Sequence, residues 1–416
     1  MAEIQPFRAW RYNKEQVPEP DKEFAPLYEV VGKKQLEALY ERTNNTIHLS
    51  MPLSHPAAAK RLQTWKQDRV LIQDQAPAIF VYYQQFTLFG VSKSYIRKGF
   101  LCLLKLEEED IVLHEGVIPQ AVADRARLLG SLKMQVVPTH GLYEDENFEL
   151  EPIMDRYIKE PMYSFLDQQG AINKIAPVTD VADIERIKAH LQPRKVFLAD
   201  GHHRLAGSFA NRKKAARDKA FSPNDPANFH FTYLSNIAAD DIRILPTHRI
   251  WQPEITPDIP SLRNAFEQWF DLTDVSRSRQ PLFDLVKGQT NTFGLASLGR
   301  RWLMKLKPGL DPLDLVDIDL PEAVKTLDYT VLHYLIFDQV LGLPYEEQRS
   351  SPEIAYEKDY SVALDAVNKG RAALTFITQE VSTSQFLAVC ESGAKMPPKS
   401  TYFFPKVNCG MAFVEV

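Results

Sequence analysis

The pattern of apolar and polar residues in the first 255 positions predicts strands interspersed with helices. Two stretches, "AIFVYYQQFTLFG" at 78–90 and "YIRKGFLCLLKL" at 95–106, are rich in aromatic and β-branched residues and are joined by a glycine-containing turn. This pattern is typical of a β-hairpin. In two other stretches the apolar residues recur every three or four positions, which places them on one face of a helix. They are Ala58, Leu62 and Trp65 in the first stretch and Ile184, Ile187 and Leu191 in the second.

A group of prolines from Pro253 to Pro260 predicts a domain boundary. Beyond it, helix-like stretches such as "IPSLRNAFEQWF" and "SVALDAVNKG" alternate with strand-like runs such as "RWLMKLK" and "ALTFITQ". We therefore expect a mixed α/β protein with a β-rich part and core over 1–255 and an α/β module over 256–416. The last stretch, "GAKMPPKSTYFFPKVNCGMAFVEV", is dense in proline, lysine and aromatic residues, so we expect this tail to pack back on the core.

Composition narrows the class of protein and its partners. Hydrophobic residues make up 44% and charged residues 25% of the 416 positions, which are ordinary globular values. A formal net charge of −5 offers no excess of Lys and Arg for a nucleic-acid backbone, so a nucleic-acid partner is disfavoured. Three widely spaced cysteines, no export signal and no long apolar run predict a soluble, cytoplasmic protein with no membrane partner.

The segment "VFLADGHHRLAG", which begins at Val196, carries the strongest functional signal. A continuous apolar run predicts a buried strand, and the spacing of apolar residues after Arg204 predicts a helix. Gly201 permits a tight turn between them, so the helix should begin at His202 or His203. The free N–H groups and positive dipole end of such a helix attract phosphate or another anion.

The side chains at this turn extend the prediction to a nucleotide with a metal ion. Arg204 offers a bidentate fork for phosphate, and either histidine offers a donor. A carboxylate at Asp200 would repel phosphate unless Mg²⁺ lay between them, which predicts Asp200 as a metal ligand. Two simpler interpretations stay open: Asp200 could be the N-cap of the helix, and one histidine could be buried and hydrogen-bonded.

Three further segments add candidates to the same site. "LHEGVIPQAVADR" supplies Glu115, beside His114, as half of an acid/base pair or as part of an exposed loop end, and Arg125 as a phosphate ligand. "ILPTHRI" supplies His248 and Arg249, which repeat the histidine and arginine of the first turn. Lys399 follows two prolines and could meet a phosphate. Neither a Walker A loop nor a dinucleotide-binding glycine pattern is present.

These segments, together with "PFRAWRYN", "FAPLYEVV" and "MPPKSTYFFPK", resemble the bacterial and archaeal family known as domain of unknown function 1015. The segment from Asp200 to Arg204 is also similar to the corresponding turn of ADP-dependent serine kinases in the ParB/sulfiredoxin-like superfamily. The chain departs from the family pattern at Val117 and Val122, where that pattern has threonine and lysine. Loss of that lysine would weaken phosphate binding, and this member could have altered or lost its activity.

The resemblance implies a ParB/sulfiredoxin-like core and a phosphotransferase that uses ADP or ATP with Mg²⁺. In that interpretation Glu115 is the base toward the hydroxyl of a small metabolite, with free L-serine as the first candidate. Asp200 and His203 complete the catalytic set. The phosphate ligands are Gly201, His202, His203, Arg204, His248, Arg249, Arg125 and Lys399. The alternatives are a nucleotide-binding switch or adaptor without turnover, and a phosphate-ester hydrolase.

Overall fold

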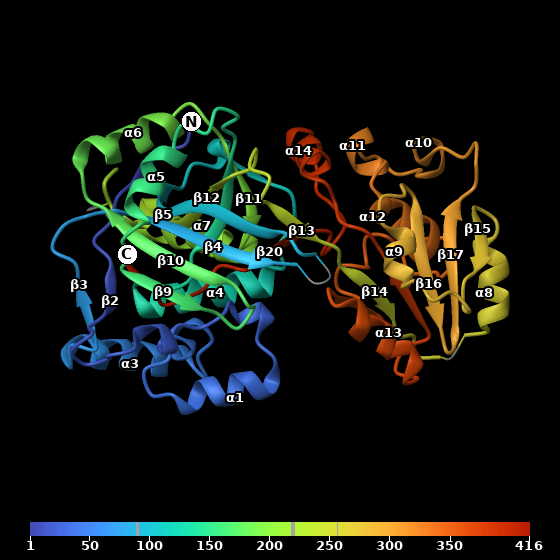
Figure 1. The fold of residues 1–416 in the computed structure, drawn as a ribbon, viewed down its shortest axis with the longest axis horizontal. Coiled ribbons are helices and arrows are strands. Elements are labelled where there is room, and N and C mark those ends of the chain that lie inside the picture. Colours follow the sequence, from blue (N-terminus) through green and yellow to red (C-terminus); the bar gives the residue numbers. More distant parts are fainter. Residues whose placement is uncertain (89–90, 218–220, 256) are drawn as a thin grey trace. The chain divides into compact units, whose positions relative to one another are not determined.

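The structure, a computed structural model, describes residues 1–88, 91–217, 221–255 and 257–416. The chain divides into two compact units (Figure 1). Unit 1 comprises residues 1–113, 117–242 and 405–416, and unit 2 comprises residues 114–116 and 243–404. The expected boundary at residue 255 lies 13 positions after the observed one at 242, because strands β13 (Arg243–Leu245) and β14 (His248–Trp251) pair only with strands of unit 2. The tail from Pro405 to Val416 belongs to unit 1.

Unit 1 is built on a nine-stranded mixed sheet in the order β6-β11-β8-β12-β5-β4-β10-β9, with β1 also paired to β5. The strands of this sheet are β1 (Ile4–Gln5), β4 (Ile79–Thr87), β5 (Ser94–Lys105), β6 (Ile111–Leu113), β8 (Thr139–Tyr143), β9 (Tyr163–Leu166), β10 (Ile172–Val178), β11 (Val196–Asp200) and β12 (Phe229–Asn236). Two small sheets pair β2 (Trp10–Tyr12) with β3 (Leu71–Gln73), and β7 (Met134–Gln135) with β21 (Val414–Glu415).

Helices cover both faces of this sheet (Figure 1). They are α1 (Lys33–Glu41), α2 (Ile47–Ser50), α3 (His55–Gln67), α4 (Pro119–Leu132), α5 (Glu151–Tyr157), α6 (Val181–Leu191) and α7 (His202–Ala215), with the 3₁₀ helices η1 (Pro20–Glu23), η2 (Tyr28–Val30), η3 (Glu108–Asp110) and η4 (Pro226–Asn228). Successive residues of β4 alternate between two hydrophobic cores: Phe80 and Tyr82 pack with α3 and α4, and Val81 and Tyr83 pack with α5 and α6. The sheet is therefore buried on both faces.

The elements expected in unit 1 are confirmed. The hairpin is β4 and β5, paired from Phe80 with Leu101 to Thr87 with Ser94; its glycine turn lies outside the described residues. The two amphipathic helices are α3 and α6, and the six residues expected on their inner faces are all buried.

Unit 2 contains a six-stranded antiparallel sheet in the order β15-β17-β16-β19-β14-β18. Its other strands are β15 (Phe270–Asp274), β16 (Thr292–Ser297), β17 (Arg300–Leu306), β18 (Ile354–Glu357) and β19 (Leu374–Ile377), and β20 (Tyr402–Phe404) pairs with β13. The helices are α8 (Ile259–Phe266), α9 (Leu282–Val286), α10 (Pro312–Leu315), α11 (Glu322–Lys325), α12 (Asp328–Val331), the π-helix η5 (Leu332–Asp338), α13 (Tyr360–Asn368) and α14 (Thr383–Glu391). The prediction of a mixed α/β protein is thus confirmed.

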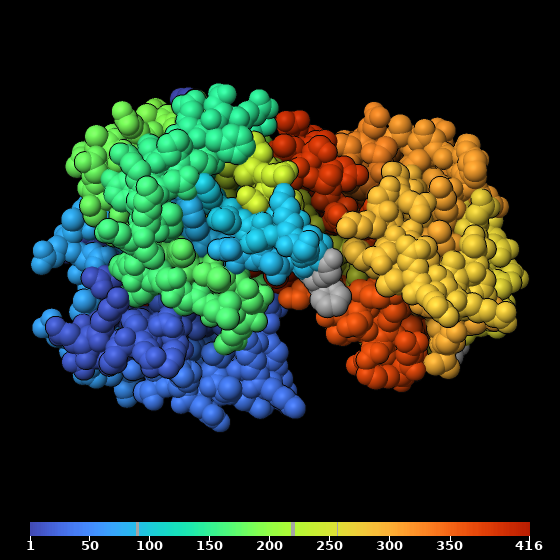
Figure 2. Space-filling view, in the orientation of Figure 1, coloured from blue at the N-terminus to red at the C-terminus, as the bar shows by residue number. Residues whose placement is uncertain are grey.

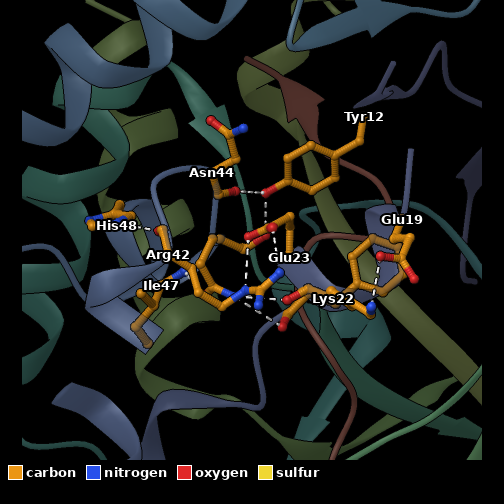
Figure 3. Close-up of polar contacts among 11 residues, drawn as sticks. Tyr12, Glu19, Lys22, Glu23, Arg42, Asn44, Ile47 and His48 are labelled. Atoms are coloured by element: carbon orange, nitrogen blue, oxygen red, sulfur yellow. Dashed lines mark hydrogen bonds and ion pairs between the residues drawn. The ribbon is translucent and has the colours of Figure 1, made fainter. Parts of the chain in front are cut away.

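The first fifty residues form the surface of unit 1 that is coloured blue in the space-filling view (Figure 2). Polar contacts hold this segment together (Figure 3). The Tyr12 hydroxyl donates to the Asn44 carbonyl at 2.6 Å, and the Arg42 guanidinium pairs with Glu23 at 2.6 Å. His48 contacts the Arg42 carbonyl at 2.9 Å. These contacts fix the short helix α2, which ends at Ser50 beside the site described below.

Candidate functional site

The site centres on the turn between β11 and α7, where the predicted strand, glycine turn and helix are all present. The strand ends at Asp200, Gly201 has φ +97°, and the helix begins at His202. A Cβ atom at Gly201 would lie 2.6 Å from Thr139 Cγ2, so the position excludes a side chain as well as favouring the glycine conformation. Gly201 is the N-cap, and no side chain caps the helix. Asp200 therefore does not act as the N-cap.

Both carboxylate oxygens of Asp200 are bound by basic side chains of unit 1. Lys406 donates to Oδ1 and Arg204 donates to Oδ2. The side chains of all three residues are buried, with exposed fractions of 11% for Asp200, 7% for Arg204 and 6% for Lys406. Burial alone would raise the pKa of Asp200, but Lys406 and Arg204 more than offset this and hold that pKa well below its usual value. Asp200 is therefore an anion that forms ion pairs with two cations.

Arg97 on β5 adds a third positive charge to this group. Its side chain donates to Gln84 and to the Pro405 carbonyl, and no residue that the structure describes accepts a hydrogen bond from its Nε or Nη1. The pKa of neighbouring His140 is lowered well below its usual value by burial and then by Arg97, so this ring is neutral. Arg97, Arg204 and Lys406 are thus three buried cations grouped near the carboxylate of Asp200. A group of buried cations of this kind favours an anion nearby.

The two adjacent histidines point in different directions, as consecutive positions on a helix must. His202 is buried, with 6% of the residue exposed. His203 is half-buried, and its Nε2 accepts a hydrogen bond from the backbone N–H of Ile118 at 3.0 Å. The first turn of α7 is thereby joined to the start of α4.

A pocket lies between α4 and α7, next to Arg204. The two helices approach closely at Gly207, where a Cβ atom would lie 3.1 Å from the Ala126 backbone nitrogen. The pocket holds about 460 Å³, including space open to solvent, and most of its surface is apolar. Its lining residues are Tyr28, Leu49, Ser50, Arg125, Leu128, Leu129, Leu132, Met134, Gln135, Val136, Val137, Arg204, Ser208 and His230.

The Tyr28 ring lines the pocket and lies near the side chains of two arginines. The Arg125 guanidinium carbon lies 4.9 Å and that of Arg204 lies 6.0 Å from the centre of the Tyr28 ring. Burial raises the pKa of Tyr28 to about 12, so its hydroxyl is protonated at neutral pH. Arg125, predicted as a phosphate ligand, is held by Asp124 at 2.5 Å and by the Ser50 carbonyl at 3.1 Å.

The remaining candidates form a second group, within unit 2. The Lys399 backbone N–H donates to Glu115 at 3.2 Å. Arg249 is fully buried in strand β14, donates to the Pro398 carbonyl at 2.9 Å and faces the Tyr329 ring at 4.1 Å. His248 is also buried, and burial lowers its pKa to about 3. Arg249 and His248 thus lie within a strand that is paired on both sides, and of these four residues only Glu115 and Lys399 are accessible.

Six residues of the site were missed by the sequence prediction: Lys406, Arg97, Tyr28, Ser50, Ser208 and His230. Lys406 lies in the tail whose unusual composition predicts an anchored segment, which was the one available signal. Arg97 belongs to the hairpin and is one of several charged residues on it. No local pattern distinguishes it from an exposed strand residue.

Asp200 as it stands does not fit the predicted Mg²⁺, because Lys406 and Arg204 occupy both of its oxygens. In the part of the chain that the structure describes, no three His, Cys, Asp or Glu side chains are grouped so that they could hold a metal ion. In the same residues no helix is both long and apolar enough to traverse a bilayer.

The sequence and the structure can now be compared with known proteins. A family model described as protein of unknown function (DUF1015) matches residues 4–330. The chain belongs to this family. The resemblance seen in the sequence is confirmed, and the site described above is the site of a DUF1015 protein. A search of curated proteins gives no match.

Solved structures that match this DUF1015 protein share little sequence with it. A conserved hypothetical protein from Pyrococcus furiosus is 12% identical, with 76% of this chain and 94% of that chain covered and a TM-score of 0.37. A free serine kinase in complex with AMP is 12% identical, with 76% and 91% covered and a TM-score of 0.39. C-terminally truncated SbnI from Staphylococcus aureus is 12% identical, with 74% and 84% covered and a TM-score of 0.34.

Proposed function

We propose that this protein is a nucleotide-dependent phosphotransferase that acts on the hydroxyl group of a small metabolite, with free L-serine as the first candidate. The observation that carries the proposal is the group of buried positive charges near the start of α7, where Arg204 and Lys406 bind the carboxylate of Asp200 and Arg97 lies close by. Buried positive charge of this kind is costly unless an anion compensates it. The N–H groups at the start of α7, which no side chain caps, add further affinity for phosphate.

In this proposal the chemistry needs little beyond positioning. Phosphoryl transfer passes through a loose transition state, so cations that hold the transferring group supply most of the rate. Arg204, His203 and the N–H groups after Gly201 hold the phosphates, and Arg97 and Lys406 provide the surrounding positive field. Asp200 keeps Arg204 and Lys406 in place. No step is assigned to a metal ion at Asp200.

Glu115 is the proposed base toward the acceptor hydroxyl. It precedes Ile118 by three residues, and Ile118 donates to His203 at 3.0 Å. Lys399, Arg249 and His248 act with Glu115 in this proposal, with Lys399 as the accessible cation for an acceptor or phosphate group.

The proposal is tested by incubating the protein with ADP or ATP and a panel of hydroxyl-bearing metabolites, with Mg²⁺ and with EDTA, and following products by ³¹P NMR. We expect a new phosphate ester, formed roughly 100-fold or more slowly by Glu115→Gln, because general-base catalysis contributes about 10²–10⁴. Glu108→Gln, a change at an exposed glutamate, is the matched control and should have the rate of the unmodified protein. Absence of any ester with every acceptor refutes the phosphotransferase.

A nucleotide-binding switch is the second candidate, and the occupied carboxylate of Asp200 favours it. With both oxygens bound by Lys406 and Arg204, the site can hold an anion without presenting a metal ligand for turnover. Nucleotide binding without transfer or hydrolysis in the same experiment would establish the switch. Release of inorganic phosphate alone would instead identify the hydrolase.

A further inference from the structure

The pocket between α4 and α7 is shaped by apolar side chains from several elements of unit 1. Its walls include Leu128 and Leu129 from α4, Leu49 from α2, and Val136 and Val137 from the segment before β8. Small-molecule sites combine apolar walls with a few polar groups, and this pocket has both. The pocket therefore has the lining of a small-molecule site.

Two buried polar atoms belong to this pocket and have no hydrogen-bond partner among the residues that the structure describes. They are Ser50 Oγ and His230 Nε2, in residues that are 1% and 2% exposed. Buried polar atoms in proteins are almost always paired, and one without a partner loses its hydrogen bond to water without replacement. A ligand that brings its own donor and acceptor groups would satisfy both atoms.

The hydrogen bond at His230 Nδ1 determines whether Nε2 of the same ring donates or accepts in the pocket. Nδ1 and the Ser208 hydroxyl lie 2.8 Å apart, and burial, together with Arg204, lowers the pKa of His230 to about 3. The ring is therefore neutral at pH 7. When Ser208 donates to Nδ1, the proton of the ring resides on Nε2, which then donates toward the pocket. The Ser50 hydroxyl can either donate or accept.

Arg204 joins this pocket to the cationic group at Asp200. Its guanidinium binds Asp200 through Nη2, and the same side chain lines the pocket. Ser208 follows Arg204 by four residues, or about one helical turn of 5.4 Å along α7. One ligand can therefore place an anionic end at the start of the helix and an aromatic end beside Ser208.

We infer that the pocket binds the heterocyclic base of the nucleotide, with Ser50 and His230 recognising the polar edge of that base. A nucleobase combines two apolar faces with an edge of donors and acceptors, which matches leucine and valine walls around two unpartnered polar atoms. The inference rests on the proposed function for the nature of the ligand, and it adds that Ser50 and His230 determine base specificity. Ser208 positions the His230 ring.

The test compares the affinities of adenosine, guanosine, cytidine, uridine, the corresponding diphosphates and pyrophosphate by calorimetry. We expect the protein to prefer one base. Ser50→Ala should bind the nucleoside and the diphosphate of that base roughly three- to tenfold more weakly, because one hydrogen bond is lost. His230→Gln should change the preference among bases, while pyrophosphate affinity stays constant in both variants. Ser131→Ala on α4, an exposed serine that donates to the Arg127 carbonyl, is the matched control.

The outcomes separate this inference from the proposed function. Two results would overturn the base pocket and leave phosphoryl transfer untouched. One is that nucleoside diphosphates bind no more tightly than pyrophosphate. The other is that Ser50→Ala, with unaltered circular dichroism, leaves the nucleoside affinity unchanged. A Ser50-dependent nucleoside affinity in a protein that transfers phosphate to no acceptor supports the pocket and refutes the phosphotransferase.

Discussion

Lys406, in the tail, donates a hydrogen bond to Oδ1 of Asp200, a residue 206 positions earlier in the chain. The Lys406 backbone is also fixed, because its N–H donates to Gln169 at 3.0 Å and its carbonyl accepts from Gln84 at 3.2 Å. The tail thus forms part of the candidate site. Asp200 acts as the centre that orders Lys406 and Arg204.

Lys406→Met should destabilise unit 1 by about 3 kcal/mol, because removing one partner of a buried ion pair leaves the other charge without compensation. Affinity for pyrophosphate should also fall, since one of three cations is lost. Urea unfolding and calorimetry measure the two effects. Lys66→Met is the matched control: Lys66 also pairs with the tail, at Glu415, but that carboxylate is half exposed. A surface pair contributes at most about 1 kcal/mol, so equal effects of the two changes would contradict the role given to Lys406.

The strand, turn and helix around Gly201 could be predicted because their signals are local. A buried strand, a glycine and an amphipathic helix each have a short-range pattern, and they occur in the expected order at Val196–Asp200 and His202–Ala215. The partners of Asp200 could be predicted only in part. Arg204 is one helical turn away, but Lys406 approaches through tertiary folding that no local spacing encodes.

The base pocket and the interior placement of Arg249 were beyond sequence reasoning for a related reason. Three separate elements, α2, α7 and β12, supply polar residues to one pocket: Ser50, Ser208 and His230. Nothing in the sequence around each residue indicates this arrangement. Arg249 has the same residue type as Arg204, but it lies within a strand that is paired on both sides, and its side chain contacts residues of unit 2 such as Tyr329. The residue types predicted which side chains could bind an anion, but their burial in the fold determines which of them a ligand can reach.

Gly201→Ala should disrupt the site through a clash as well as through backbone strain. The new Cβ would lie 2.6 Å from Thr139 Cγ2 and 2.9 Å from Arg204 Nη2 at φ +97°. Gly170→Ala is the matched control in unit 1, since Gly170 has φ +79° with no atom within 4 Å of an added Cβ. The control should lose roughly 1–2 kcal/mol of stability from strain alone. Gly201→Ala should lose about 1–3 kcal/mol more from overpacking, together with pyrophosphate binding. Equal losses of stability would contradict the clash.

Stability should fall as the pH drops below about 6.5, the usual pKa of histidine. Burial lowers the pKa of His230, His248 and His333 to about 3, so between pH 6.5 and 3 these residues bind protons in the unfolded chain and not in the folded one. Their contribution is present above pH 6.5 and is lost as the pH falls toward 3. Each contributes a slope of about 1.4 kcal/mol per pH unit to the unfolding free energy. His248→Gln should reduce that slope by about 1.4 kcal/mol per pH unit, as measured by urea unfolding from pH 7.5 to 4.5. An unchanged slope would mean that this ring is protonated in the folded protein.

Metal binding at Asp200 should depend on Lys406. In the unmodified protein without nucleotide, Lys406 and Arg204 occupy both carboxylate oxygens, so Mn²⁺ should not bind there. Lys406→Met frees Oδ1 and removes a repelling charge, and a divalent cation that prefers carboxylate oxygens can then approach. Water-proton relaxation should therefore show Mn²⁺ binding by Lys406→Met that is absent from the double variant with Asp200→Asn. Mn²⁺ binding by the unmodified protein that Asp200→Asn abolishes would falsify the assignment of Lys406 to this carboxylate and would restore Asp200 as a metal ligand.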